Sequence, residues 1–180
     1  MSPVLRLSAV VCAAALALTA CGSSQPKAST EAPASCSSPA SPATTTATTG
    51  APPVANATDL KKAPVPSAGT PPPPTHLVTV DLVKGTGPTA GAGSTVRVQY
   101  VGVNYADGKV FDSSWSRGQP VDFPLSGVIA GFAQGITGMK VCGRREVVIP
   151  PSLGYGAQGA GSAVGPNETL VFVIDLLKVT

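Results

Sequence analysis

The uneven distribution of aromatic side chains constrains the fold of this 180-residue chain more than any other feature of its sequence. All eight Phe, Tyr and Trp residues follow Thr75. Large apolar side chains supply most of the surface that a domain buries, so residues 76–180 have to form the core. This stretch is long enough for one domain. The overall counts of 19 Pro and 20 Gly, and the aromatic content of 4%, are therefore averages over segments of different composition.

The first 20 residues have the layout of a secretory signal peptide. Arg6 is followed by an apolar run over 7–18, which is too short to cross a bilayer of roughly 30 Å as a helix. The sequence Leu18-Thr19-Ala20-Cys21 resembles the bacterial lipobox, in which cleavage leaves the cysteine first and its thiol is acylated. We therefore expect a lipoprotein signal peptide over 1–20 and a lipid anchor at Cys21, on the extracytoplasmic face of the cell membrane. The alternative is an ordinary signal peptide with an incidental cysteine.

Residues 22–75 consist mostly of Ala, Ser, Thr and Pro. They show no apolar periodicity, so they offer little surface to offset the entropy lost on ordering. The sequence predicts a disordered tether over 21–75 that starts at the lipidated Cys21. The run Pro71–Pro74 should have polyproline II character, and the Thr clusters could carry glycans.

Two cysteines remain after signal cleavage and lipidation: Cys36 in the predicted tether and Cys142 in the domain. An exported protein can form disulfides. A bridge between a tether and a domain is unusual, however, so we expect two free thiols.

The pattern of residues 76–180 is mainly that of strands. Apolar and polar residues alternate in Thr95–Val103, where Val96, Val98 and Tyr100 share one face. Asp107-Gly108 favours a hairpin turn. Residues 128–139 have helical spacing, although three glycines weaken the helix. Further strands are expected over 77–83, 121–125, 144–149 and 169–179. The predicted fold is α+β: an antiparallel β-sheet wrapped around one short α-helix.

Charge and residue counts exclude several classes of function. A net charge of +3 is too small and too scattered for a nucleic-acid partner. His76 is the single histidine, and it lies at the edge of the domain, which leaves no histidine for acid–base chemistry. One His and four Cys also make a Cys/His metal site improbable. We expect no metal and no cofactor. Taken alone, the pair Arg144-Arg145 is expected to be solvated.

Five segments in order resemble the FKBP-type peptidyl-prolyl cis-trans isomerases. They lie at 98–102, 107–114, 123–132, 149–156 and 169–177, and include Asp107-Gly108-Lys109-Val110-Phe111-Asp112-Ser113-Ser114 and Ile149-Pro150-Pro151-Ser152-Leu153-Gly154-Tyr155-Gly156. The resemblance covers essentially all of residues 76–180 and implies an FKBP-like isomerase domain. It implies that the protein accelerates isomerisation of X-Pro bonds in exported or envelope polypeptides, which would be its partners.

The chemistry suits this composition. Rotation about a peptide bond faces a barrier of roughly 18–20 kcal/mol, and X-Pro bonds exchange slowly enough to limit folding. A catalyst for this rotation needs an apolar pocket that holds the twisted imide and a few polar groups that orient its carbonyls. It needs no nucleophile, metal or redox group.

The resemblance also assigns the residues of the site. It implies catalytic roles for Asp112, Tyr155, Tyr100 and Phe132, with Phe132 as the pocket floor. It implies substrate-binding roles for seven further residues: Phe111, Arg117, Val121, Val128, Ile129, Val164 and Phe172. The backbone N–H of Ile129 is expected to donate a hydrogen bond to the substrate. Taken singly, each aromatic residue would be read as core, and Asp112 as a turn residue.

The sequence departs from the family pattern in the pocket. Phe132 stands where many relatives have Trp, Val121 stands where they often have a second aromatic residue, and small residues fill 159–164. We therefore expect a roomier pocket and weakened binding of macrolide inhibitors. The alternative function is a non-catalytic chaperone or binding module for Pro-containing segments on the cell surface. We expect a monomer in either case.

Overall fold

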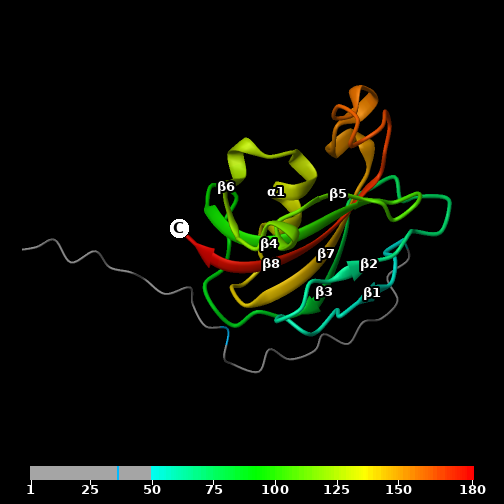
Figure 1. Cartoon of the computed structure of the whole chain (residues 1–180). Coiled ribbons are helices and arrows are strands. Elements are labelled where there is room, and N and C mark those ends of the chain that lie inside the picture. Colours follow the sequence, from blue (N-terminus) through cyan, green and yellow to red (C-terminus); the bar gives the residue numbers. More distant parts are fainter. Residues whose placement is uncertain (1–35, 37–49) are drawn as a thin grey trace, which may run out of the picture. The chain divides into compact units, whose positions relative to one another are not determined.

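A six-stranded antiparallel sheet forms the centre of the fold (Figure 1). The computed structural model describes residues 36 and 50–180, so the predicted signal peptide, Cys21 and most of residues 21–49 lie outside the described residues. The strand order is β3-β7-β8-β4-β5, and β6 pairs with β4. The bounds are β3 Val78–Val83, β4 Thr95–Asn104, β5 Val110–Ser113, β6 Val121–Pro124, β7 Gly143–Ile149 and β8 Leu170–Val179. The predicted antiparallel α+β fold is confirmed.

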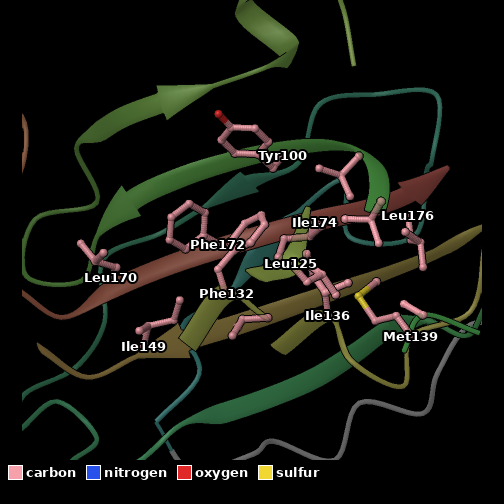
Figure 2. Packing of buried hydrophobic residues seen from close by; sticks show 14 of the residues in the cluster. Tyr100, Leu125, Phe132, Ile136, Met139, Ile149, Leu170, Phe172, Ile174 and Leu176 are labelled. Carbon is pink, nitrogen blue, oxygen red and sulfur yellow. The ribbon is translucent and has the colours of Figure 1, made fainter. Parts of the chain in front are cut away.

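The helix α1 (Ala130–Ile136) packs on one face of this sheet and buries the main core (Figure 2). Val96, Val98 and Tyr100 point into this core, as the alternation in β4 predicts. Four short 3-10 turns complete the loops: η1 Trp115–Arg117, η2 Leu125–Gly127, η3 Pro151–Leu153 and η4 Gly156–Gln158. The turn between β4 and β5 has Gly108 at a φ of 71°, the conformation for which Asp-Gly is suited.

Residues 50–75, which we call the strap, are ordered, and this corrects the prediction of a disordered tether up to Thr75. The strap contains a two-stranded sheet of β1 (Val54–Ala55) and β2 (Val65–Pro66), drawn in cyan in Figure 1. The strap's Gly69 N–H donates to the Tyr105 carbonyl at 2.7 Å, and the Tyr105 hydroxyl donates to the Thr70 carbonyl at 3.0 Å. The composition argument failed here because main-chain groups, rather than large side chains, make these contacts.

Arg144 is completely buried, which corrects the expectation that the pair Arg144-Arg145 is solvated. Its guanidinium forms a two-pronged ion pair with Asp175, at 2.5 and 2.7 Å. The remaining N–H groups donate to three strap carbonyls, those of Asn56, Asp59 and Lys62, at 2.6, 3.1 and 3.0 Å. Arg145 faces the opposite side of β7 and pairs with Asp81 at 2.6 Å. A buried charge needs partners for all its donors, and the strap supplies those that Asp175 leaves unmet.

Cys36 and Cys142 form a disulfide, with their Cα atoms 5.3 Å apart, so the prediction of two free thiols is wrong. Cys142 lies immediately before β7, on the core side of the sheet. The bridge joins the chain before the strap to the domain. Within the described part of the chain, no helix is long and apolar enough to cross a membrane, and no group of three His, Cys, Asp or Glu could hold a metal ion.

Candidate active site

A pocket of about 370 Å³ opens between the sheet, the N-terminal end of α1 and the loop that carries Tyr155. The strands β4, β5, β6 and β8 each contribute side chains to its wall. Its lining is mostly aromatic and aliphatic, with one carboxylate. The lining residues are Tyr100, Phe111, Asp112, Phe123, Gly127, Val128, Ile129, Phe132, Tyr155 and Phe172.

Phe132, in the first turn of α1, is the centre of the aromatic cluster beneath the pocket (Figure 2). Its ring meets those of Phe172, Phe123 and Tyr100 at centroid distances of 5.1, 5.8 and 6.1 Å. All three pairs are edge-to-face, the arrangement that the aromatic quadrupole favours. Phe111 stacks edge-on against Phe172 at 5.4 Å. The rings hold one another in place, so the pocket is preformed.

Asp112, Tyr100 and Arg117 form a hydrogen-bonded network at the rim of the pocket. The Tyr100 hydroxyl donates to Asp112 Oδ2, and Arg117 Nη1 donates to Asp112 Oδ1 at 2.5 Å. Arg117 Nη2 also donates to the Tyr100 hydroxyl at 2.9 Å, and the guanidinium carbon lies 5.8 Å from the ring centroid of Tyr100. The carboxylate is therefore held in one orientation by two donors.

The network fixes the protonation states of its members. Burial, and next the hydrogen bond to Asp112, raise the pKa of Tyr100 to about 12. Burial on its own would raise the pKa of Asp112, but the hydrogen bonds from Tyr100 and Arg117 outweigh it and hold that pKa below its ordinary value. At neutral pH the site thus presents an ionised carboxylate beside a neutral phenol.

Tyr155 and Ile129 supply polar groups at the mouth of the pocket. Tyr155 lies between η3 and η4 with 38% of its surface exposed, and its hydroxyl bonds to no other described residue. Ile129 precedes α1, and its carbonyl accepts from the N–H groups of Phe132 and Ala133. Its own N–H comes before the first turn of the helix, where N–H groups have no partner within the helix.

Eight of the eleven site residues that the resemblance implies line this pocket, and three do not. Arg117 contacts the site through Asp112 and Tyr100. Val121 packs partly buried against the core, and Val164 is buried within it. Phe123 and Gly127 line the pocket but were not predicted. Phe123 had a signal, because it is two residues from Val121 on the same strand and so shares its face.

The arrangement suits the binding of a small apolar ring with a polar backbone on either side. The floor and walls exclude water from the ring, and the rim offers a carboxylate, a phenol and a backbone N–H. Among the described residues that line the pocket there is no Ser, Cys, Lys or His to act as a nucleophile.

Comparison with known proteins gives a consistent result. The family model of the FKBP-type peptidyl-prolyl cis-trans isomerases matches residues 87–177. The chain is 52% identical over 110 residues to an FK506-binding protein of Streptomyces anulatus, covering 59% of this chain and 89% of that one. It is 51% identical over 107 residues to a probable FK506-binding protein of Corynebacterium glutamicum, covering 59% and 90%.

Solved structures show the same relationship. The crystal structure of FkpA from Escherichia coli matches with a TM-score of 0.56 and 42% identity, over 59% of this chain and 49% of that one. The match thus spans about half the length of FkpA. Since the family model covers half of the chain, including α1 and the whole pocket lining, the chain belongs to the FKBP-type peptidyl-prolyl cis-trans isomerases.

Proposed function

We propose that this protein catalyses cis-trans isomerisation of X-Pro bonds in exported or envelope polypeptides. The observation that carries the proposal is the preformed aromatic pocket with the Asp112 network at its rim. Uncatalysed X-Pro exchange takes tens to hundreds of seconds, so such an activity would remove a slow step in folding.

Each part of the pocket has a role in this reaction. The proline ring sits on Phe132, which removes it and its imide from water. Planar imide has the larger charge separation, so an apolar surrounding disfavours it relative to the twisted state. Tyr155 and the Ile129 N–H donate to the substrate carbonyls that flank the ring. The Asp112 carboxylate faces the twisting carbonyl carbon, and Tyr100 with Arg117 holds it there.

The test is a proline-limited refolding assay with the full chain. We expect Asp112→Ala and Tyr155→Phe each to lower kcat/KM about tenfold or more, since each removes a group that orients the imide. Gln134→Ala, on α1 but outside the pocket lining, is a matched control and should keep wild-type activity. If wild type, Asp112→Ala and Tyr155→Phe all ran at the uncatalysed rate, the protein would be a non-catalytic binder of Pro segments.

We further propose that the protein acts outside the cytoplasm, anchored to the membrane through Cys21. The support is the sequence of the first 21 residues. Two acyl chains suffice for stable anchoring. Cys21→Ala should move the protein from the membrane fraction to the soluble fraction, whereas Cys36→Ala should leave it in the membrane. Retention of Cys21→Ala in the membrane would refute the anchor.

Macrolide binding is proposed to be weak because the pocket floor is Phe132. Phe132→Trp adds an indole N–H and apolar area beneath the ligand, so we expect it to raise the affinity for FK506. Calorimetric titration of wild type and variant measures this. Equal affinities would show that the floor residue does not limit macrolide binding.

A further inference from the structure

On the side of β4 that faces β5 and β6, two residues have no partner in a strand, and one of them is Tyr100. β5 pairs with β4 from Val101 to Val103, and β6 pairs with it from Thr95 to Val98. Neither strand pairs with the two residues between these stretches, Gln99 and Tyr100. The main chain of Tyr100 is buried, so its N–H and carbonyl need partners from elsewhere.

Ser114 supplies these partners. Its Oγ accepts from the Tyr100 N–H at 2.8 Å, and its own N–H donates to the Tyr100 carbonyl at 3.0 Å. The Ser114 hydroxyl proton is donated to Gln99 Oε1. The side chain is completely buried. One serine thus takes the place of a strand along this part of β4.

The position of Ser114 in the chain connects it to both partners of Asp112. Ser114 follows Asp112 by two residues, and it is the N-cap residue of η1, whose last residue is Arg117. Serine at an N-cap commonly accepts from a backbone N–H of the helix. Here the side chain makes no such bond and turns back to β4 instead. Its carbonyl accepts the Arg117 N–H at 3.1 Å.

We infer that Ser114 is a positioning residue of the isomerase site: by binding the main chain of Tyr100 it places the phenol against Asp112 and sets the start of the turn that carries Arg117. Ser114 is not among the residues that line the pocket, so it is placed to act through Tyr100 and not by contact with a substrate. Tyr100 is held at both ends, through its main chain by Ser114 and through its hydroxyl by Asp112. The inference rests on the proposed isomerase function.

Ser114→Ala, made in the full chain, tests this inference. The variant leaves the Tyr100 N–H buried without an acceptor, and we expect Tyr100 to shift away from Asp112. The kcat/KM should fall about fivefold, the factor that one net hydrogen bond is worth, with the loss mainly in kcat. Ser113→Ala is the matched control: the neighbouring hydroxyl accepts only from the Ser116 N–H, at 3.3 Å, and its loss should change kcat/KM less than twofold.

Two further measurements separate positioning from general destabilisation. In a Tyr100→Phe background the phenol is absent, so Ser114→Ala should cost less than twofold there. The pKa of the Asp112 carboxyl, followed by NMR, should rise in Ser114→Ala because a donor has moved away, and should stay unchanged in Ser113→Ala. An equal loss in both backgrounds, or an unchanged Asp112 pKa, would overturn the inference.

If Ser114→Ala does not fold, Gln99→Leu tests the inference in its place. This variant removes the acceptor of the Ser114 hydroxyl but leaves Ser114 able to accept from the Tyr100 N–H. It should shift the Asp112 pKa in the same direction by a smaller amount, and no shift would count against the inference. Because the NMR measurement needs no turnover, it tests Ser114 even if the wild type proves inactive. An inactive wild type would therefore contradict the proposed function alone.

Discussion

Tyr100 and Asp112 set the pH range over which the pocket keeps one charge state. The pKa of Tyr100 is raised to about 12, and that of Asp112 is held below its ordinary value. The carboxylate is therefore ionised, and the phenol neutral, between about pH 5 and pH 8. We expect kcat/KM to be flat between about pH 5 and pH 8 in a refolding assay corrected for the uncatalysed rate. A bell-shaped profile within this range would show that another titrating group takes part.

Glu146 makes the stability of the protein, in contrast, depend on pH. Its side chain is 2% exposed on β7, on the same face as Arg144 and Val148, and its Oε1 has no hydrogen-bond partner among the described residues. Burial raises its pKa to about 8. The folded protein therefore binds a proton here that the unfolded chain releases above the ordinary carboxyl value of about 4.3.

The sign of the effect follows from this difference. The stabilising contribution of protonated Glu146 is complete below about pH 4, declines as the pH rises, and is lost once the pH passes about 8. Denaturant unfolding at pH 5 and pH 8 should show wild type losing several kcal/mol more than Glu146→Gln between these values. Equal losses in the two proteins would mean that Glu146 is ionised in the folded state.

Two glycines of α1 determine how closely the helix approaches the sheet. A Cβ added at Gly131 would lie 2.3 Å from Ile149 Cγ2, and one added at Gly135 would lie 2.6 Å from Val147 Cγ1. Both neighbours are fully buried residues of β7 and have no room to move. Glycine lowers the helix propensity of this segment. The same two glycines, however, let α1 lie close to the sheet, so that Phe132 between them reaches the core.

Gly135→Ala tests this account. Alanine gains about 1 kcal/mol in helix propensity, but overpacking against Val147 costs about 1–3 kcal/mol, so we expect a net loss of stability. Chemical denaturation measures it. Gly93→Ala is the control, because a Cβ there meets nothing within 4 Å. A stabilised Gly135→Ala would show that the helix can move outward at no cost.

The elements show what the sequence could and could not predict. The residue pattern located β3, β4, β6, β7 and β8 to within two residues. In β4 the alternation matches the burial, because Val96, Val98 and Tyr100 are buried on one face. The aromatic wall of the pocket followed from the resemblance, which fixed Tyr100, Phe111, Phe132 and Phe172. The strap was not predicted, because its main-chain carbonyls bind Arg144 and a pattern of side chains does not indicate where carbonyls lie. For the same reason Arg144 looked like an ordinary solvated arginine.

The strap predicts where the folded domain begins. Residues 76–180 alone would lose the three carbonyls that bind Arg144 and the cover over Tyr105. We expect the piece 50–180 to be more stable than 76–180 by about 3 kcal/mol or more, since hydrogen bonds to a charged group are worth about 1.5–3 kcal/mol each. Thermal and denaturant unfolding of both pieces, each with Cys142→Ser, gives the difference. Equal free energies of unfolding for the two pieces would show that the strap does not stabilise the domain.

At the scale of the whole molecule, the chain from Cys36 through the strap is attached to the sheet by two interactions of different chemistry. Arg144 holds it through hydrogen bonds, and the Cys36–Cys142 bridge closes a loop with a sequence separation of 106 residues. This loop contains the strap and much of the sheet. A long loop loses more unfolded-state entropy on closure than a short one, so the bridge acts on the stability of the entire domain.

Removal of the bridge should therefore destabilise the protein without altering its pocket. The double variant Cys36→Ser/Cys142→Ser is expected to lower the free energy of unfolding by about 2–5 kcal/mol. Its kcat/KM in the refolding assay should match wild type at temperatures where both are folded, because the pocket lining includes neither cysteine. Cys21→Ser, which keeps the bridge, should unfold like wild type under oxidising conditions. If a reducing agent left the melting temperature of wild type unchanged, Cys36 and Cys142 would not be paired in solution, and the hydrogen bonds of Arg144 and Tyr105 would hold the strap without a covalent bridge.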